Sequence, residues 1–338
     1  MEYEVKAPGV IKLLGEHAVV YGKLSLAMAI DVYASAKSSE SGTFAIVLKD
    51  LGKSRRFGSR ELGALYKSFM SRKTIGEYIA GNATYGEFLP FATVLAVASA
   101  EYGINAQKIV LHSNIPMQKG FASSAALSAA LATSLLAKTR ATDAEIVELA
   151  RVGEIVMHKS EGAGKIDANA SYYGGLVAYS QKDGARRIED AEAPSMLAID
   201  TGPKKSTAET VGHVAKLFEH EKAKTMRVLD AIEKCTLKGI EALKSKNFKA
   251  FGAAMYEDQE YLKKLGVSSR SLDKAVSIAK RHGAYGAKLS GGGGGGIAIA
   301  IDKEGLKETM EKAGFTCMRV SMAAEGAKTA CEHARTTR

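Results

Sequence analysis

The most constraining feature of this sequence is a run of six glycines, Gly291–Gly296, set between two short apolar segments. Glycine loses more conformational entropy on folding than any other residue, so ordering such a run is costly. The run is most easily tolerated where the backbone must approach another group closely, as in an anion-binding nest. A flexible surface loop is the alternative, and the apolar segments flanking the glycines tightly argue against it. The run formally satisfies GxGxxG but lacks the strand–turn–helix setting of a dinucleotide site.

A second segment, IPMQKGFASSAALSAALATSLLAK, places Gly120 and two serines before a helix predicted over Ser123–Lys138. Free amides and a partial positive charge make a helix N-terminus attractive to anions. The hydroxyls of Ser123 and Ser124 can donate to phosphate oxygens or coordinate Mg²⁺. Taken alone, a helix capped by a serine is an equally good interpretation. The GxxxxGK[ST] nucleotide pattern is absent, because GKS at 52–54 has Val47 in place of the first glycine.

A third segment, GEIVMHKSEGAGKIDANASYYGG, carries two carboxylates of interest. Glu154 is expected on a helix, and Ser160–Gly164 is expected to form the return that leads to Asp167, in a loop of small residues before a strand. A carboxylate in such a loop can take a proton from a substrate hydroxyl, and a helix glutamate can hold Mg²⁺. By themselves, a solvated helix residue and a turn former explain the two acids more simply.

Composition narrows the class of protein. The 338 residues suit two domains, and 46% hydrophobic with 25% charged residues is a globular balance. The net charge of +10 favours anionic partners, although basic residues spread along the whole chain indicate mainly a solvated surface. Nucleic acid is disfavoured, because neither an RNP-type aromatic platform nor a base-reading basic helix occurs.

Compartment is indicated by cysteine usage and by the apolar runs. The three scattered cysteines, Cys235, Cys317 and Cys331, form no CxxC pair, which argues against a zinc site or disulfide framework and favours a reducing cytoplasm. The N-terminus lacks an apolar signal region, and the apolar run 121–137 is interrupted and too short for a bilayer. A cytoplasmic enzyme without a membrane partner is expected.

Periodicity predicts α+β structure in both halves of the chain. Strands are expected at 3–7, 10–14, 24–30, 42–51 and 108–113, and helices at 88–103, 123–138 and 143–158. A hairpin with its turn at Asp183-Gly184 follows, and the chain is then largely helical over 206–266 and 269–282. Strand, glycine loop, strand, helix and a final strand complete it. We expect two lobes, 1–190 and 191–338, with the active site at their junction.

With APGVIKLLGEHAVVYGKLSLAMAI at 7–30 added, the sequence resembles the superfamily of galactokinase, homoserine kinase, mevalonate kinase and phosphomevalonate kinase (GHMP kinases). Its mevalonate-phosphorylating members are the most similar. IPMQKGFASSAAL, GKIDANASYYGG and KLSGGGGGGIAIAI occur in the family's order and spacing, so the resemblance covers essentially the whole chain. It implies an N-terminal lobe like ribosomal protein S5 domain 2 and a ferredoxin-like C-terminal lobe, with ATP in the cleft.

The resemblance also implies roles for individual residues. Asp167 would take the proton from the 5-hydroxyl of mevalonate, and Mg²⁺ would be held by Ser124 and Glu154. The ATP phosphates would be wrapped by Lys119, Gly120, Phe121, Ala122, Ser123, Ser124 and Ala125. The acceptor would be bound by Asp167 together with Glu16, His17, Val19, Ser290 and Gly291.

The chain departs from the family pattern at three positions. Val10 stands where the family has a catalytic lysine; Lys12, on the same face of a strand, and Lys165 are the candidates to replace it. Gln118 and Ala122 replace two glycines.

These departures leave the acceptor open: phosphomevalonate, the 3-hydroxyl of mevalonate and a sugar are alternatives. Mevalonate diphosphate decarboxylation is another, although the intact GEH and GKID segments argue against it. The oligomeric state, with a homodimer among the options, and feedback by prenyl diphosphates stay open.

Overall fold

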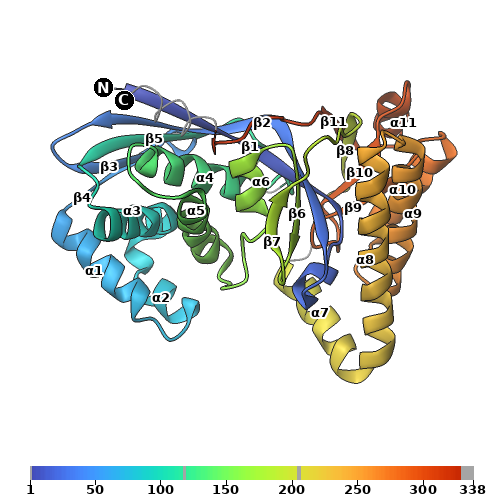
Figure 1. Ribbon diagram of the computed structural model, residues 1–338, viewed down its shortest axis with the longest axis horizontal. Helices are drawn as coiled ribbons and strands as arrows, with labels where there is room; N and C mark the ends of the chain where they lie inside the picture. The colour runs from blue at the N-terminus through green and yellow to red at the C-terminus, as the bar shows by residue number, and fades with distance from the viewer. Residues whose placement is uncertain (1, 117–118, 204–206, 329–338) are drawn as a thin grey trace.

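The protein is described by a computed structural model that covers residues 2–116, 119–203 and 207–328. It contains a seven-stranded sheet and a four-stranded sheet, each with its own helices (Figure 1). The first sheet consists of β1 (Glu2–Leu14), β2 (Ser25–Glu40), β3 (Phe44–Leu48), β4 (Lys53–Phe57), β5 (Gln107–Ser113), β6 (Leu176–Ser180) and β7 (Gly184–Arg187). The predicted mixture of strands and helices in both halves is confirmed.

The long strand β2 organises the first sheet. It pairs with β1 over most of its length, and it also pairs with β6 near its start and with β5 near its end. The segments predicted as two strands at 3–7 and 10–14 form the single strand β1, with a register shift between Pro8 and Gly9. The hairpin of β6 and β7 is confirmed, but its turn is 181–183, because Gly184 already pairs with Ser180.

Three helices lie together on one face of this sheet: α3 (Leu89–Tyr102), α4 (Ser123–Leu136) and α5 (Asp143–His158) (Figure 1). The alanine-rich α4 is almost entirely buried, because its small side chains let it pack closely against β1 and β2. The predicted end of α3 and the predicted start of α5 are confirmed. Gly103 caps α3 in a left-handed conformation with φ 60°, and Thr142 forms a capping box at the start of α5.

Two helices of the first half were not predicted: α1 (Ser59–Met70) and α2 (Ile75–Gly81). The signal for α1 was present, since Leu62, Leu65 and Phe69 recur at helical spacing and are buried. The first half also contains the short helix α6 (Asp167–Tyr173) and three 3₁₀ turns: η1 (Ala18–Tyr21), η2 (Lys49–Leu51) and η3 (Ala83–Phe88).

The second sheet follows the β-α-β-β-α-β order of a ferredoxin-like fold. Its strands are β8 (Met196–Asp200), β9 (Ala287–Ser290), β10 (Ile297–Ile301) and β11 (Thr316–Val320), arranged β11-β8-β10-β9 and all antiparallel. Its helices are α7 (Thr207–His220), α8 (Lys222–Lys244), α9 (Phe248–Lys264), α10 (Arg270–Arg281) and α11 (Leu306–Lys312). The helical stretch predicted over 206–266 is therefore three helices, and its first residue lies outside the described residues.

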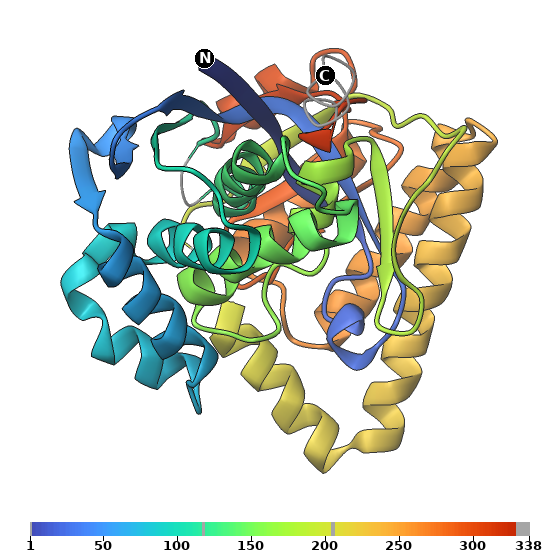
Figure 2. The same cartoon turned by 60° about the vertical axis from the view of Figure 1, so that its left-hand side comes forward.

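The two sheets are joined by apolar packing rather than by a loose linker. Buried residues of β1 and β2 belong to the same core as Phe251 of α9 and Ile297 of β10. At Gly239 of α8, an added Cβ would lie 2.2 Å from Leu14 Cδ1 of β1, so only glycine allows this approach. Figure 2 shows α8 and α9 beside the end of the first sheet. A junction of this kind holds residues of the two halves in fixed relative positions.

One helical stretch in the described residues, Ala83–Tyr102, has the length and hydropathy of a membrane span. Of its most apolar 18 residues, 61% are buried inside the protein. Buried core helices of other proteins can have the same length and hydropathy.

Candidate active site

The start of α4 lacks a side-chain cap. Its N-cap residue is Ala122, in the left-handed region with φ 52° and ψ 42°, and this residue gives the helix amides no side-chain hydrogen bond. Ser123 and Ser124 are the first helical residues and not caps, so the interpretation of a serine-capped helix is wrong. A non-glycine residue in this conformation costs about 1–2 kcal/mol, and such strain concentrates at functional sites. Uncapped amides at a helix N-terminus favour an anion there.

The loop before α4 contacts both halves of the protein. The Val10 amide of β1 donates to the Phe121 carbonyl at 2.9 Å, and a Cβ at Gly120 would lie 3.2 Å from Ile297 of β10. Lys119 forms an ion pair with Asp200 at the end of β8. Partial burial opposes ionisation of Asp200, but Lys119 and the Gly202 amide lower the pKa of Asp200 overall. Phe121 and Ala125 are buried, so only their backbones can face a ligand. Gln118 lies outside the described residues.

Asp167 and Lys12 meet at the next helix. Asp167 is the first residue of α6 (Asp167–Tyr173), which corrects the prediction of a loop position; the strand begins only at Leu176. The Lys12 ammonium on β1 forms an ion pair with the Asp167 carboxylate, and the two side chains are 23% and 19% exposed. An aspartate in the first turn of a helix is stabilised as the anion. A charged pair that is partly open to solvent can meet a substrate.

The neighbourhood of Val10 explains why Lys12 takes this place. Val10 has no exposed surface and packs in a small apolar cluster with Ile166 and Ala170, beside α6. Residues two apart on a strand face the same side, so Lys12 also points toward α6. The backbone carbonyl of Lys165, the other candidate, accepts from Asn169 Nδ2 at 2.6 Å. Lys12 is thus the lysine that the fold brings to Asp167.

His158 links the two predicted magnesium ligands. Its Nε2 lies 3.2 Å from Ser124 Oγ and 3.5 Å from Glu154 Oε2. A hydrogen bond to Glu154 raises the pKa of His158 against the effect of burial, and Asp167 raises the pKa further. His158 was missed from the sequence, although its spacing of four residues from Glu154 on a predicted helix was the available signal.

The same residues fit Mg²⁺ by their chemistry. Glu154 is 1% exposed, and in the described part of the chain its Oε1 has no hydrogen-bond partner. A buried carboxylate oxygen near a serine hydroxyl offers the hard oxygen ligands that Mg²⁺ prefers. No group of three or more His, Cys, Asp or Glu side chains suited to a metal occurs among the described residues. Two protein ligands suffice where phosphates and water supply the rest.

The glycine run is fixed by its own contacts. Gly291 and Gly293–Gly296 all have positive φ, which other residues adopt only under strain. The Gly294 amide donates to the Val267 carbonyl at 2.7 Å, and a Cβ at Gly293 would lie 2.1 Å from that oxygen. A Cβ at Gly291 would meet nothing within 4 Å. The run is therefore held in place at Gly293 and Gly294, whereas free space surrounds the backbone at Gly291.

The residues predicted to bind the acceptor line the contact between the halves. His17 has φ 60°, and its Nε2 donates to the Gly292 carbonyl at 2.9 Å. Burial lowers the pKa of the His17 imidazole, which favours the neutral ring. Ser290 Oγ accepts from the Lys12 amide at 3.0 Å and donates to the Lys12 carbonyl at 2.9 Å. Val19 is half buried in η1.

Beneath Glu16 lies a charged contact that was not predicted. Lys288 of β9 has no exposed surface, and its ammonium contacts Glu16 Oε1 at 2.5 Å and Asp258 Oδ2 of α9 at 3.4 Å. Asp258 could have been suspected, because it falls on the apolar face of a helix that includes Met255 and Leu262.

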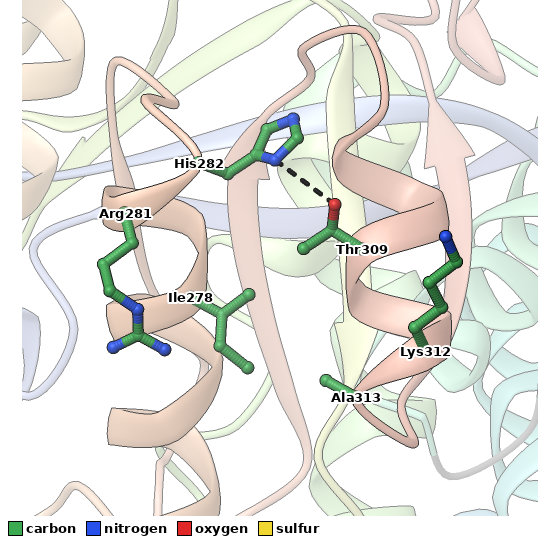
Figure 3. A pocket seen from close by; sticks show the side chains of 6 residues that line it. All are labelled: Ile278, Arg281, His282, Thr309, Lys312 and Ala313. Carbon is green, nitrogen blue, oxygen red and sulfur yellow. Dashed lines mark hydrogen bonds between the residues drawn. The ribbon is translucent and has the colours of Figure 1, made fainter.

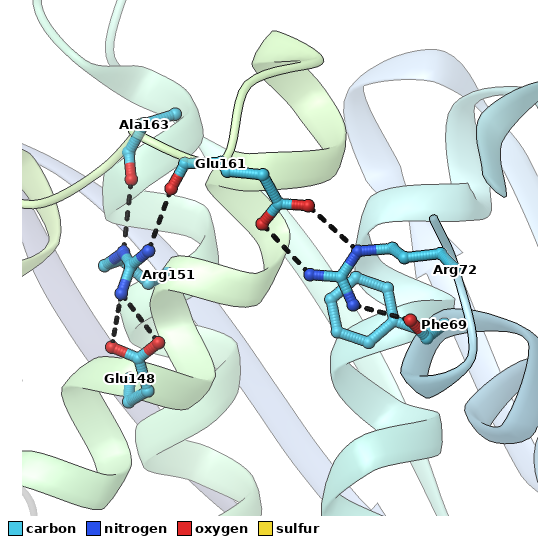
Figure 4. A network of polar contacts seen from close by, with 6 residues as sticks. All are labelled: Phe69, Arg72, Glu148, Arg151, Glu161 and Ala163. Atoms are coloured by element: carbon cyan, nitrogen blue, oxygen red, sulfur yellow. Dashed lines mark hydrogen bonds and ion pairs between the residues drawn. The ribbon is translucent and has the colours of Figure 1, made fainter. Parts of the chain in front are cut away.

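Two arginines hold the return that precedes Asp167 (Figure 4). Arg72 donates from Nε and from its terminal nitrogen to both carboxylate oxygens of Glu161, each at 3.0 Å. Arg151 of α5 donates to the Glu161 carbonyl at 3.0 Å and to the Ala163 carbonyl at 3.3 Å. Charge-assisted forked contacts of this kind give geometric specificity. No motif in the sequence indicated these arginines.

A surface pocket lies between α10 and α11 (Figure 3). It contains none of the predicted site residues and is lined by Ile278, Arg281, His282, Thr309, Lys312 and Ala313. It is therefore separate from the site described above.

Comparison with known proteins gives concordant results. A family model described as "GHMP kinases N terminal domain" matches residues 90–175, and one described as "GHMP kinases C terminal" matches 240–316. The chain is 31% identical to mevalonate kinase of Thermococcus sibiricus over 91% of each chain, and 31% identical to that of Pyrococcus abyssi over 95% of each. Mevalonate kinase of Methanococcus jannaschii superposes with a TM-score of 0.76 at 28% identity, covering 96% of this chain and 99% of that one.

Proposed function

Because the chain belongs to the mevalonate kinase family of GHMP kinases, we propose that it transfers the γ-phosphoryl group of ATP to the 5-hydroxyl of mevalonate. The products are ADP and 5-phosphomevalonate, and the hydroxyl proton leaves to a base. The family makes the protein a small-molecule kinase that uses ATP. The identity of the acceptor and the roles of single residues are the proposal.

ATP is bound by its phosphates at the start of α4. The amides from Gly120 to Ala125 and the hydroxyl of Ser123 surround the phosphates, supported by the absence of a side-chain cap at Ala122. Lys119 either breaks its ion pair with Asp200 to bind a phosphate or contacts Asp200 and a phosphate together. The lobe of residues 1–190 supplies this site, and the lobe of 191–338 covers it with the glycine run.

The acceptor lies between Asp167 and the contact between the two halves at Glu16 and His17. Asp167 accepts the proton of the attacking hydroxyl, and Lys12 beside it offsets negative charge on the transferring group. Phosphoryl transfer needs little covalent participation by the protein, so positioning and charge neutralisation supply most of the rate. Val19, Ser290 and Gly291 complete the acceptor side, Ser290 by holding the backbone of Lys12.

Ser124 and Glu154 are proposed to hold Mg²⁺. When bound there, the ion neutralises charge on the β- and γ-phosphates and orients them for in-line transfer. The unpartnered buried oxygen of Glu154 supports this assignment. Gly164 packs directly against this side chain, since a Cβ at Gly164 would lie 2.6 Å from Glu154 Cβ.

The cellular setting is proposed on composition alone. Three cysteines without a CxxC pair favour a reducing cytoplasm, and we expect neither membrane nor nucleic acid among the partners. A homodimer is the assembly to test first, by light scattering of the purified protein.

The single observation that carries the function is the Lys12–Asp167 pair, set beside a helix start without a side-chain cap. The test is to incubate the purified protein with ATP, Mg²⁺ and one alcohol from a panel. The panel contains mevalonate, phosphomevalonate, mevalonate diphosphate, homoserine and galactose, and ³¹P NMR fixes the position of the new phosphate. A 5-phosphate on mevalonate is expected. A 3-phosphate, a preference for another alcohol, or release of CO₂ from mevalonate diphosphate would replace the proposal by the corresponding activity.

A further inference from the structure

Three ionisable side chains meet where the halves of the protein join, and none of them reaches solvent. Lys288 and Asp258 have no exposed surface, and Glu16 is 4% exposed. Lys288 contacts Glu16 Oε1 at 2.5 Å and Asp258 Oδ2 at 3.4 Å. This Glu16–Lys288–Asp258 cluster connects the segment after β1 with α9 and β9.

The hydrogen bonds of the cluster are incomplete. An ammonium has three N–H donors. Lys288 gives one to Glu16 and one to the Leu289 carbonyl at 2.7 Å, and its remaining ion-pair contact is with Asp258. Within the described residues, Glu16 Oε2 and both carboxylate oxygens of Asp258 have no hydrogen-bond partner. Buried polar atoms without partners are costly, so this arrangement needs a reason.

Charge supplies the reason. Two ionised carboxylates and one ammonium would leave a buried charge of −1, which is strongly unfavourable. One proton on an acid makes the cluster neutral. Burial raises the pKa of Asp258, and the negative charge of Glu16 raises it further, while the positive charge of Lys288 opposes the shift.

Two further titratable groups adjoin the cluster, and neither adds a charge to it. Cys235 of α8 faces Asp258, and burial raises the pKa of this thiol to about 12. His17 adjoins Glu16, and burial lowers the pKa of its imidazole. The ammonium of Lys288 lies 2.5 Å from Glu16 but 3.4 Å from Asp258, so Asp258 has the weaker ion pair and is the acid that holds the proton of the cluster.

We propose that Asp258 is a positioning residue of the acceptor site, which holds Lys288 against Glu16 and carries the proton that keeps the cluster neutral. The inference rests on the proposed function, because it takes Glu16 and His17 as the acceptor-binding end. Asp258 itself lies on α9 and acts through Lys288. Moving Glu16 also moves His17, its neighbour in the chain, whose ring holds the Gly292 carbonyl. Acceptor binding should therefore depend on Asp258 more than ATP binding does.

Three variants of the full chain test this. Asp258→Ala removes the carboxyl group, and Asp258→Asn keeps its shape in a permanently neutral form. Glu257→Gln is the matched control, since Glu257 is the next residue toward the start of α9 and pairs with Lys238 at the surface. For each protein, kcat and the KM values for mevalonate and Mg-ATP are measured from about pH 6 to about pH 9, and thermal unfolding is measured from about pH 4 to about pH 9.

Asp258→Ala should raise KM for mevalonate by ~10-fold, with KM for ATP within about twofold of wild type. Asp258→Asn should have the same kcat/KM for mevalonate as wild type near about pH 6. Toward about pH 9, Asp258 of the wild type ionises, so kcat/KM of the Asn variant divided by that of wild type should rise. Glu257→Gln should follow wild type throughout. A purely structural role would instead lower kcat and affect both substrates alike at every pH.

The inference is overturned if folded Asp258→Ala binds mevalonate normally, or if the Asn-to-wild-type ratio does not change with pH. If Asp258→Ala does not fold, the pH ratio of Asp258→Asn decides. A failure of Asp258→Asn to fold also counts against the inference, because a neutral residue of the same shape should preserve the cluster. If wild type phosphorylates no mevalonate, the proposed function fails by itself. The cluster is then judged from the unfolding temperatures of Asp258→Asn and wild type across the pH range.

Discussion

Lys12→Met should slow phosphoryl transfer by ~10²- to 10³-fold, the loss seen when one preorganised charge-stabilising group is removed from an active site. The magnitude follows from the geometry. Lys12 is 23% exposed beside Asp167 at 19%, so its charge acts in a medium between water and protein interior. A unit charge about 4 Å from a developing negative charge contributes about 4 kcal/mol at an effective dielectric constant of ~20. Solvent exposure reduces this to about 3 kcal/mol, or ~10²-fold in rate.

The assay follows ADP release at saturating mevalonate and Mg-ATP, with nucleotide affinity measured separately by displacement of a fluorescent ATP analogue. Lys6→Met is the matched control, because Lys6 is an exposed lysine on the same strand, β1. Lys165→Met tests the alternative that Lys165 stabilises the transferring group. ATP affinity should stay within about threefold in all three variants, because the phosphate site at α4 is left intact.

Val10 provides a second arm of the same test. Val10→Lys restores the lysine of the family pattern but places an ammonium among the buried side chains of Ala27, Ile166 and Val177. Burying that charge costs several kcal/mol, so Val10→Lys/Lys12→Met should unfold at lower temperature and regain no activity. The reasoning is refuted if Lys12→Met keeps normal turnover, if Lys165→Met alone abolishes it, or if Val10→Lys rescues the Lys12 variant.

Three further predictions concern neighbouring elements. Asp167→Asn should retain ATP binding but lose at least ~100-fold in kcat, and near-normal turnover would remove it from the base role. Gly293→Ala should destabilise the protein by at least ~2 kcal/mol, because its Cβ would lie 2.1 Å from the Val267 carbonyl. Gly291→Ala has free space for its Cβ and should lower the stability by only about 1–2 kcal/mol. Equal unfolding temperatures of the two variants would contradict this. Burial raises the pKa of Asp258 from 3.8 to about 7, so the folded state keeps a proton that the unfolded chain releases. Stability from this group is full below pH 3.8 and lost toward about pH 7, a loss that urea unfolding should find in wild type and not in Asp258→Asn.

Local backbone features were predictable because they depend on adjacent residues. Gly103 ends α3, Thr142 begins α5 with its capping box, and the glycine run approaches the Val267 carbonyl closely at Gly293. Asp167 shows the limit of this kind of inference. A stretch of small residues before glycines suggested a loop, but the stretch forms α6, which packs against β1 and α4. Packing of this kind overrides weak local preferences.

The sequence by itself determined most of the strands and the long helices α3, α4 and α5, the need for a close approach at the glycine run, and the resemblance that pointed to a kinase. The first two follow from sterics and periodicity within a few residues, and the resemblance follows from four short motifs. Only the tertiary structure decided which lysine lies beside Asp167, that His158 joins Ser124 to Glu154, and that Asp258 lies beneath Glu16. Lys12 and Asp167 are 155 residues apart, and Glu16 and Lys288 are 272 apart. Partners at such separations are set by how two sheets pack on a shared core, which no local pattern records.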